Sequence, residues 1–312
     1  VPYGRLLEAT RATLADAGAA PRPPLVRAVL AVFARRWLLA PVMLGGRLLR
    51  ATGLARALGR RLGGRPGFAM AMLASTASPV AGLRRRWRPR PDRARGTAAL
   101  LTGCVMDGLY GHVHAATRRT LAHHGWTVRG ARGQRCCGAL HAHAGDLAGA
   151  RRLARANVAA FERSGADAIV ANSAGCGAML KEYGHLLADD PRWADRARRV
   201  AERVRDVSEL LAADGGPRPA PGAIPGRVAY DAPCHLLHAQ RVAAPPLAVL
   251  DAVAGLARVP LPDADQCCGS AGIYTLVEPA VSDAVLAPKL RQIAATGATL
   301  VATGNPGCMM QL

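Results

Sequence analysis

Two adjacent cysteines followed by a glycine occur twice in this chain, as Cys136-Cys137-Gly138 and Cys267-Cys268-Gly269, and they direct attention to sulfur chemistry. Single cysteines flank each pair at matching distances. The eight cysteines therefore form two sets, Cys104, Cys136, Cys137 and Cys176 in the first and Cys234, Cys267, Cys268 and Cys308 in the second. Equivalent members lie 130 to 132 residues apart and no cysteine is left over, which indicates an internal repeat.

Four converging thiolates suit zinc or an iron–sulfur cluster, because both take soft sulfur ligands. Neighbouring residues of an extended strand point to opposite sides, so both sulfurs of a pair can face one site only from a loop. Gly138 and Gly269 supply the necessary backbone freedom. Structural zinc sites more often have a two-residue gap between paired ligands, so the adjacent pair favours a multinuclear cluster. Simple packing and thiol exchange remain alternatives.

Several other polar residues accompany the cysteines. The nearby histidines are His112, His114, His141, His143, His235 and His238. They are either surface or hydrogen-bonding residues around the sulfurs, or ligands. Lys181, Glu182 and Tyr183 follow Cys176 and read as solvated helix residues. No Ser/His/Asp arrangement, phosphate loop or paired carboxylate is evident, so we expect no catalytic residue that oxidises a substrate independently.

Charge is unevenly distributed along the 312 residues, which carry a formal net charge of +20. Residues 1–96 contain nineteen arginines but only Glu8, Asp16 and Asp92 as acids, whereas the remainder is nearly balanced. Such a block suits an anionic membrane surface or an acidic partner. It equally suits a solvated helical connector. No aromatic-interleaved stripe or zinc-finger spacing supports nucleic-acid binding, and we expect none.

The cellular compartment is expected to be the cytoplasm, with possible peripheral contact at the cytoplasmic face of the inner membrane. No secretory signal opens the sequence, and the longest uncharged run, residues 66–83, contains two prolines and many small residues. A membrane span needs about 20 strongly apolar residues. In a reducing compartment, eight cysteines favour metal or redox chemistry over disulfides.

Alternating strands and helices predict an α/β fold with mostly parallel sheets in both repeats. TAALLTG, DAIVANSAGC, RVAYDAPC and ATLVATGNPGC read as strands that run into cysteines, and Asp146 and Gly165 read as the limits of a helix. A helix over 236–255 is expected to be interrupted at Pro245-Pro246. Because ligands of such sheets bind beyond the carboxyl ends of strands, four sulfurs should meet at one edge in each repeat.

Three regions follow from this pattern. Residues 1–96 form a basic helical region, amphipathic and broken near Pro41 and Gly45-Gly46, ending in an exposed linker over 84–96. Residues 97–212 form the first cysteine-rich domain and residues 227–312 the second, with a proline- and glycine-rich link over 213–226.

The cysteine motifs carry a specific family resemblance. LLTGCVMDGLYGHVHAATRRTL, RCCGALHAHAGDLAGARRLARANVAAF and NSAGCGAMLKEYGHLL resemble the first cysteine-rich CCG domain of glycolate oxidase iron–sulfur subunits. YDAPCHLLHAQRV, CCGSAGIYTLVEPA and ATGNPGCMMQL resemble the second. Residues 97–312 match closely, and residues 1–96 resemble the family's helical connector more loosely.

The resemblance implies an electron-transfer subunit of a glycolate dehydrogenase complex. FAD-binding subunits would oxidise glycolate to glyoxylate, and this chain would pass the electrons towards a quinone-linked acceptor. The family carries 4Fe-4S clusters in an N-terminal ferredoxin-like segment whose cysteine run is absent here, so the chain is expected to be a fragment that lacks both ends. The eight cysteines become the expected cofactor-binding and metal-binding residues of the two CCG domains.

Other interpretations of the resemblance stay open. The donor could be lactate or glycerol-3-phosphate, or the complex could resemble a heterodisulfide reductase. CCG domains of that last kind add a fifth cysteine, but Met179 and Gln311 occupy this place here. Thioether sulfur is a much weaker ligand, so a five-cysteine cluster is not expected. A cluster-free scaffold that docks the flavin subunits is the alternative from a different functional class.

Overall fold

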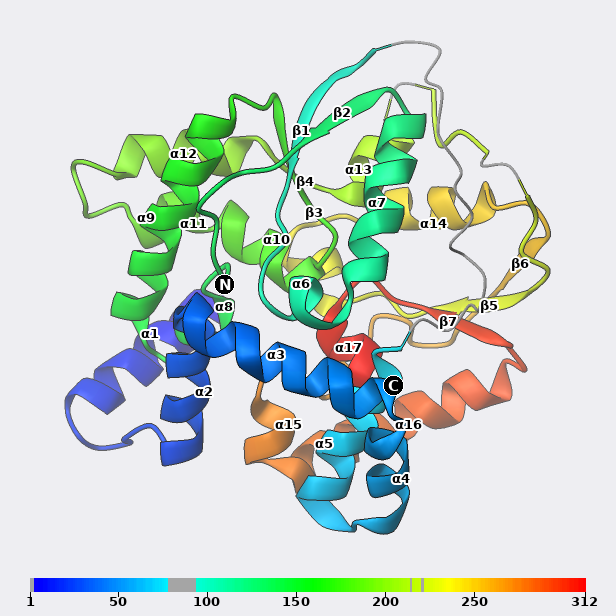
Figure 1. The fold of residues 1–312 in the computed structure, drawn as a ribbon, viewed down its shortest axis with the longest axis horizontal. Coiled ribbons are helices and arrows are strands. Elements are labelled where there is room, and N and C mark those ends of the chain that lie inside the picture. The colour runs from blue at the N-terminus through cyan, green and yellow to red at the C-terminus, as the bar shows by residue number, and fades with distance from the viewer. Residues whose placement is uncertain (1–2, 78–93, 214, 220–221) are drawn as a thin grey trace.

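The computed structural model describes residues 3–77, 94–213, 215–219 and 222–312, and two parallel β-sheets organise most of them (Figure 1). One sheet has four strands in the order β2-β1-β3-β4, and the other has three in the order β6-β5-β7. Helices surround both sheets, and five further helices precede β1 within the described residues 3–77. The predicted fold, two repeated α/β units after a helical region, is confirmed.

The first sheet lies within residues 97–212 apart from the first residue of β1. Its strands are β1 (Gly96–Leu100), β2 (Trp126–Arg129), β3 (Ala168–Ala171) and β4 (Val204–Asp206). All three pairings are parallel. Strand β3 is buried along its whole length, as expected of a short apolar run covered on both faces. Helical crossovers return the chain to the same edge, so the carboxyl ends of the strands meet there.

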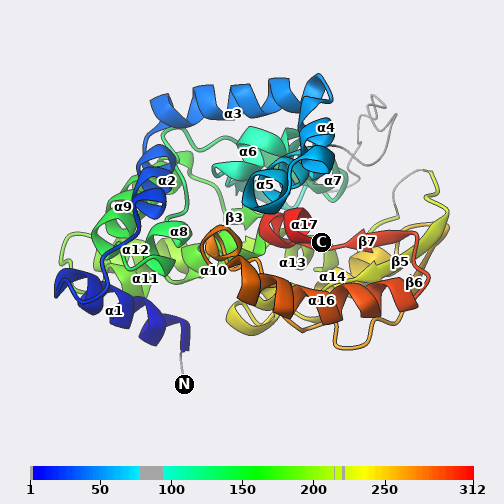
Figure 2. The same cartoon turned by 90° about the horizontal axis from the view of Figure 1, so that it is seen from below.

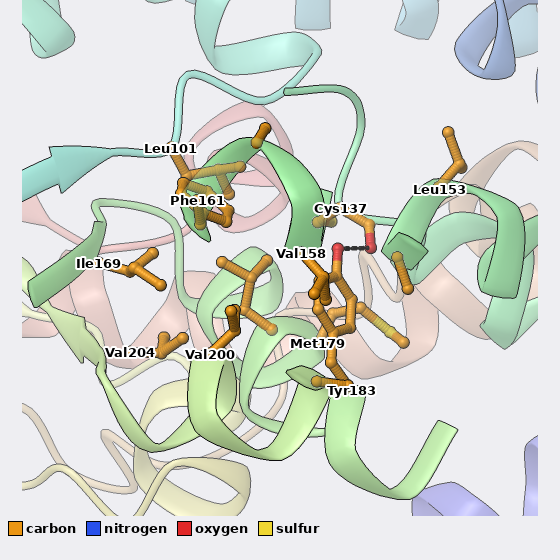
Figure 3. Packing of buried hydrophobic residues seen from close by; sticks show 14 of the residues in the cluster. Leu101, Cys137, Leu153, Val158, Phe161, Ile169, Met179, Tyr183, Val200 and Val204 are labelled. Atoms are coloured by element: carbon orange, nitrogen blue, oxygen red, sulfur yellow. Dashed lines mark hydrogen bonds between the residues drawn. The ribbon is translucent and has the colours of Figure 1, made fainter. Parts of the chain in front are cut away.

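Helices connect these strands and supply the core. They are α6 (Val105–Leu109), α7 (Gly111–His123), α8 (Ala139–His143), α9 (Leu147–Ser164), α10 (Ala174–Lys181), α11 (Tyr183–Leu186), α12 (Ala194–Glu202) and α13 (Val207–Ala212). Asp146 caps α9 by accepting a hydrogen bond from Gly149 N at 2.9 Å, and Gly165 ends it with a positive φ. Both predicted limits are confirmed. Val158 and Phe161 of α9 pack among the core residues of Figure 3.

The second sheet repeats this plan over fewer elements. Its strands are β5 (Gly226–Tyr230), β6 (Leu256–Val259) and β7 (Leu300–Ala302). Its helical elements are the π-helical turn η1 (His235–Ala239), α14 (Ala244–Asp251), α15 (Tyr274–Val277), α16 (Pro279–Ala295) and α17 (Pro306–Gln311). The interruption expected at Pro245-Pro246 is slightly misplaced. The break precedes Ala244, because proline is accepted in the first turn of a helix, where its missing N–H has no partner.

The N-terminal helices pack against both repeats (Figure 2). They are α1 (Tyr3–Asp16), α2 (Pro24–Ala34), α3 (Arg36–Ala51), α4 (Leu54–Arg61) and α5 (Gly64–Ser75). The predicted break near Pro41 and Gly45-Gly46 is wrong, because α3 runs through these residues and the chain bends by 102° at Arg35 instead. Gly46 serves close packing: a Cβ there would lie 3.3 Å from Leu73. Most of the linker expected over 84–96 lies outside the described residues.

Taken singly, the helices of the N-terminal region differ from membrane-spanning segments in length or composition. No single helix in the described part of the chain is long and apolar enough to cross a membrane. Taken together, the bent pair α2 and α3 is long and apolar enough to span a membrane, judged by length and composition alone.

Candidate functional site: two four-cysteine centres

The first four cysteines meet beyond the carboxyl ends of β1 and β3. Cys104 follows β1 by four residues, and Cys176 lies in α10 just after β3. Cys136 and Cys137 occupy the loop that precedes α8. Cys104 Sγ lies 3.5 Å from Cys136 Sγ. The Cys137 thiol is hydrogen-bonded to those of Cys136 and Cys176, so the four sulfurs form one contiguous group, which we call the first centre.

The second four cysteines form an equivalent group, the second centre. Cys234 directly precedes η1 after β5, and Cys308 lies in α17 after β7. Cys268 Sγ lies 3.1 Å from Cys308 Sγ. The Cys267 thiol is hydrogen-bonded to those of Cys234 and Cys268. The structure therefore brings together all eight cysteines in the two predicted sets, while their role as ligands stays a prediction.

The glycine after each cysteine pair has the backbone conformation that the sequence predicts. Gly138 has a φ of 93° and Gly269 a φ of 82°, both in the left-handed region that disfavours residues with a Cβ. At Gly269 an added Cβ would also lie 2.5 Å from the carbonyl oxygen of Ser282. These glycines let the chain turn so that both sulfurs of each pair face the same centre.

Hydrogen bonding makes the sulfurs unequal as acids. In the first centre, the hydrogen bond from the Cys104 thiol, aided by those from Cys137 and Gly138 N, holds the pKa of Cys136 well below its usual range. In the second centre, Cys267 receives the same pattern from Cys234, Cys268 and Gly269 N, and its pKa is also strongly lowered. The thiolate is the form that binds metals. The first cysteine of each pair is thus the one most readily deprotonated.

The donor set fits an iron–sulfur cluster in its chemistry, since each centre offers four thiols and their stabilised thiolates. Two sulfur–sulfur distances, 3.5 Å between Cys104 and Cys136 and 3.1 Å between Cys268 and Cys308, are shorter than the separation of thiolates around a metal ion. Around a tetrahedral zinc ion, thiolates at about 2.3 Å from the metal lie about 3.8 Å from one another. Among the described residues, no three Cys, His, Asp or Glu side chains surround a point suited to a single metal ion. The sulfurs must move apart to receive a metal or cluster.

Most cysteines of both centres are shielded from solvent. Cys136, Cys137, Cys268 and Cys308 are each at most 4 % exposed, and Cys104 is 8 % exposed. Cys176, Cys234 and Cys267 are partly exposed. Of the four cysteines in the two adjacent pairs, Cys267 of the second centre is therefore the most exposed to solvent. Burial of this kind limits the access of water to the sulfurs.

Two of the predicted histidines, His235 and His143, lie close together beside the second centre. His235 Nδ1 is 3.6 Å from Cys234 Sγ, and its ring centroid is 5.5 Å from that of His143. His143 in turn is 2.7 Å from Glu8, through its Nδ1 and a carboxylate oxygen. Burial lowers the pKa of His235 to about 4, so its imidazole is neutral at pH 7.

The other predicted histidines divide into buried and peripheral ones. His141 is buried, lies close enough to Cys136 to affect its pKa, and has an Nδ1 atom without a hydrogen-bond partner. His114 is satisfied by Thr102 O and Asn172. His112 stacks at an angle against Tyr110, and His238 is exposed.

The two centres approach each other because the carboxyl edges of the two sheets meet. Ala174 N donates to Gly304 O at 2.9 Å, and Gly175 N donates to the side chain of Asn305 at 3.2 Å. Gln240 closes the contact from the second domain with a 2.8 Å bond to Ala174 O. In Figure 1, α10 and α17 accordingly lie together near the middle of the molecule.

Two polar residues that hydrogen-bond to the cysteine loop of the first centre, Asn157 and Tyr183, were not identified as such from the sequence. Asn157 Oδ1 accepts from Arg135 N at 2.7 Å, while its Nδ2 donates to Cys136 O and to the Tyr183 hydroxyl. The Tyr183 hydroxyl donates to Cys137 O at 2.7 Å (Figure 3). The interpretation of Tyr183 as a solvated residue is therefore wrong: α11 folds back against α9 and buries it completely.

The corresponding residue of the second domain is Lys289. Asn157 and Lys289 both lie nineteen positions before the last cysteine of their repeat (176 − 157 and 308 − 289). Lys289 is buried against the loop that precedes Cys267. The repeat alignment could have identified this pair of positions, although not their contacts.

Comparison with known proteins agrees with the geometry. The chain is a two-domain cysteine-rich protein in which residues 98–181 and 228–312 each match the CCG cysteine-rich domain, and it belongs to that family. It is 37 % identical over 230 residues to a probable glycolate oxidase iron–sulfur subunit of Bacillus subtilis, covering 73 % of this chain and 52 % of the relative. It is 34 % identical over 231 residues to the glycolate oxidase iron–sulfur subunit of Escherichia coli, covering 72 % and 56 %.

A second group of relatives has a different name. The chain is 30 % identical over 214 residues to lactate utilization protein A of Geobacillus thermodenitrificans, covering 69 % of this chain and 89 % of the relative. The chain thus spans about half the length of the glycolate oxidase relatives and most of the length of the lactate utilization protein.

Proposed function

We propose that this chain is the electron-transfer part of an iron–sulfur oxidoreductase subunit, with one cluster in each four-cysteine centre. The observation that supports this most directly is the meeting of four sulfurs, distant in sequence, at the same sheet edge in both repeats. Packing alone would not require eight cysteines in two matching groups. An iron–sulfur cluster would supply one-electron redox chemistry at each centre.

The residues that would hold the clusters are the eight cysteines. Cys104, Cys136, Cys137 and Cys176 would serve the first centre, and Cys234, Cys267, Cys268 and Cys308 the second. The family suggests 4Fe-4S clusters. Around them this chain provides hydrogen bonds that hold the cysteine loops and, at Cys136 and Cys267, N–H groups that stabilise thiolate. No residue of the chain is proposed to act on an organic substrate.

The proposed donor complex is a glycolate oxidase. FAD-binding subunits would oxidise glycolate to glyoxylate, and the centres of this chain would carry the electrons to a quinone-linked acceptor. The names of the relatives from Bacillus subtilis and Escherichia coli support this choice. Lactate is the second candidate donor, supported by the lactate utilization relatives.

Metal reconstitution tests the proposal. We expect the purified chain, incubated anaerobically with iron and sulfide, to bind iron and sulfide and to show charge-transfer absorption. Changing Cys136 and Cys137 to serine, or Cys267 and Cys268 to serine, should each remove about half of the iron, because one centre is left intact. Less than one iron per wild-type chain, with every thiol freely titratable, would reject the cluster and favour a scaffold.

The donor is tested by adding the flavin-containing partners. Reconstituted chain mixed with them should lose its visible absorption when glycolate is added, since cluster reduction bleaches it. Bleaching with lactate and not with glycolate would select the second donor. In both cases the chain alone should remain unbleached, because the substrate would be oxidised at the flavin.

The proposed location is the cytoplasmic face of the inner membrane, with α3 as the contact surface. Trp37, Leu44 and Leu48 follow one another at helical spacing on the outer side of α3 and are 71 %, 55 % and 59 % exposed. Residues 3–77 contain twelve arginines and two acidic residues. An exposed apolar stripe within an arginine-rich region matches the chemistry of an anionic lipid surface. Figure 2 shows α3 along the rim of the molecule.

Co-sedimentation with vesicles tests this contact. At low ionic strength the chain should sediment with vesicles of equimolar phosphatidylglycerol and phosphatidylcholine, and added salt should weaken binding through screening. Serine at Trp37, Leu44 and Leu48 should reduce it, whereas serine at Leu290 and Val301, exposed residues of the second domain, should not. Absence of binding at low salt would contradict the proposal.

A further inference from the structure

A fully buried lysine lies beside the second centre. Lys289, one of only two lysines in the chain, is 0 % exposed. Its Nζ donates to Ala264 O and Gln266 O, both at 2.8 Å, and lies 2.6 Å from Asp231 Oδ1. An ammonium group has three hydrogens to donate, so these three contacts can satisfy it completely.

The three contacts reach the loops that carry the cysteines. Gln266 immediately precedes Cys267, and Asp231 lies three residues before Cys234. The other carboxylate oxygen of Asp231 accepts a 2.8 Å hydrogen bond from Thr303, five residues before Cys308. One side chain of α16, through one buried carboxylate, therefore links the ends of all three cysteine-bearing loops.

The ion pair is better suited to fixing geometry than to adding stability. Removing two charges from water costs free energy that their attraction only partly returns. The first centre achieves a comparable linkage without charge. There Asn157 links the loop to Tyr183, and Gln134 links it to the end of β1 through Thr102 N and Leu100 O. The two centres thus use different chemistry at equivalent positions.

We propose that Lys289 is the positioning residue of the second centre: with Asp231, it holds the loops of Cys234, Cys267 and Cys308 in the register that lets their sulfurs meet. This inference deepens the proposed function and rests on it for the identity of the bound cluster. The arrangement of the thiols themselves is a property of the chain alone. The inference can therefore be tested with and without iron.

The test uses a neutral double variant, Lys289→Met with Asp231→Asn, so that no unpaired charge is left buried. Its control is Lys181→Met with Glu209→Gln, which removes a less buried lysine–carboxylate pair at 3.1 Å. Alkylation by iodoacetamide is followed at each cysteine by mass spectrometry on metal-free chain. We expect Cys267 and Cys268 to react about tenfold faster in the double variant, because their loop opens more often. Cys136 and Cys137 should be unchanged.

Iron binding supplies the second readout. After reconstitution the double variant should hold about half the iron of the wild type, with the loss confined to the second centre, while the control should hold the full amount. A milder variant, Thr303→Val, removes only the bond to Asp231 and should increase alkylation at Cys308 with less effect on Cys267. This variant keeps the test available if the double variant does not fold.

The outcomes separate the two proposals. The role of Lys289 would be overturned if the wild type, the Lys289 double variant and Thr303→Val were alkylated at equal rates. It would also be overturned if alkylation increased equally at all eight cysteines. If the wild type binds no iron while the contrast between Cys267 and Cys136 persists, the cluster proposal fails and the positioning role stands. If iron binding is normal in the double variant and alkylation does not change, the cluster proposal stands and the positioning role fails.

Discussion

The two cysteine-rich domains share their cysteine geometry but differ in how they support it. The first has a fourth strand and a large apolar core around Phe161 and Tyr183. In residues 226–312 the buried apolar side chains are Val228, Ala229, Pro233, Leu236, Val242, Pro246, Cys268, Leu286 and Cys308. Strands β6 and β7 have no fully buried residue. Equivalent sulfur arrangements are therefore reached with a thick hydrophobic core in one domain and with buried polar links in the other.

The two domains show that the arrangement of four sulfurs can be kept while the hydrophobic core that supports it differs. In the first domain, neutral side chains hold loops that are already fixed by a packed core. In the second, a buried ion pair spans loops over a sheet with fewer buried contacts. Backbone changes within the cysteine loops should consequently have larger effects in the second domain.

Alanine at the two glycines tests that expectation and should give the largest effect. Gly269→Ala should lower the free energy of unfolding by about 2–4 kcal/mol, because it adds left-handed strain and a clash with Ser282 O. Gly138→Ala should cost about 1–2 kcal/mol, since its added Cβ meets Ala150 only at 3.4 Å. Denaturant unfolding of both variants measures the difference. An equal cost would mean that the loop of the second domain is no more constrained than that of the first.

Removal of the Tyr183 hydroxyl gives the next effect. Tyr183→Phe leaves Cys137 O and the Asn157 amide without this partner in a buried place, which should cost about 1–3 kcal/mol. The same change at Tyr274, a partly buried residue of the second domain, should stay within about 0.5 kcal/mol. Thermal unfolding measures both. A neutral Tyr183→Phe would show that the core alone fixes the Cys137 loop.

The pH dependence of a surface pair gives the smallest effect. A hydrogen bond from Arg196 to Glu162, between α12 and α9, lowers the pKa of this carboxyl. Its stabilisation is present above the unfolded pKa, near 4.5, and disappears as pH falls through the lower folded value. Both side chains are about one-third exposed, so the contribution should stay below about 1 kcal/mol.

Glu162→Gln provides the matched measurement for this pair. Its stability should differ from that of the wild type at pH 7 and converge with it at pH 3. A constant difference in stability over this pH range would assign the effect of Glu162→Gln to packing. The ion pair with Arg196 would then not contribute to the stability of the first domain.

The main features of the site follow from the sequence because they depend on local rules. Strands that end before cysteines place them at one edge, and glycine after each pair accepts the left-handed turn. Asp146 and Gly165 marked the limits of α9 for the same reason. The spacing of eight cysteines then predicts two centres rather than one, and the structure brings the sulfurs together in those sets.

What could not be predicted depends on tertiary packing. Tyr183 follows Lys181 and Glu182 in a polar segment, and only the return of α11 onto α9 buries it. The partners of Lys289 lie 23 to 58 residues away in sequence, so no local pattern indicates them. Helix α3 likewise continues through Pro41 in spite of the helix-breaking tendency of proline, and it packs against α5 and α6.

The burial of Lys289 has a practical consequence for labelling. Amine-directed dyes react with accessible lysine side chains, and of the two lysines only Lys181 is reachable. A folded sample should therefore take up one fluorophore on its side chains, on α10 and five residues from Cys176. The fluorophore on the Lys181 side chain would report on the surroundings of the first centre without any engineered residue.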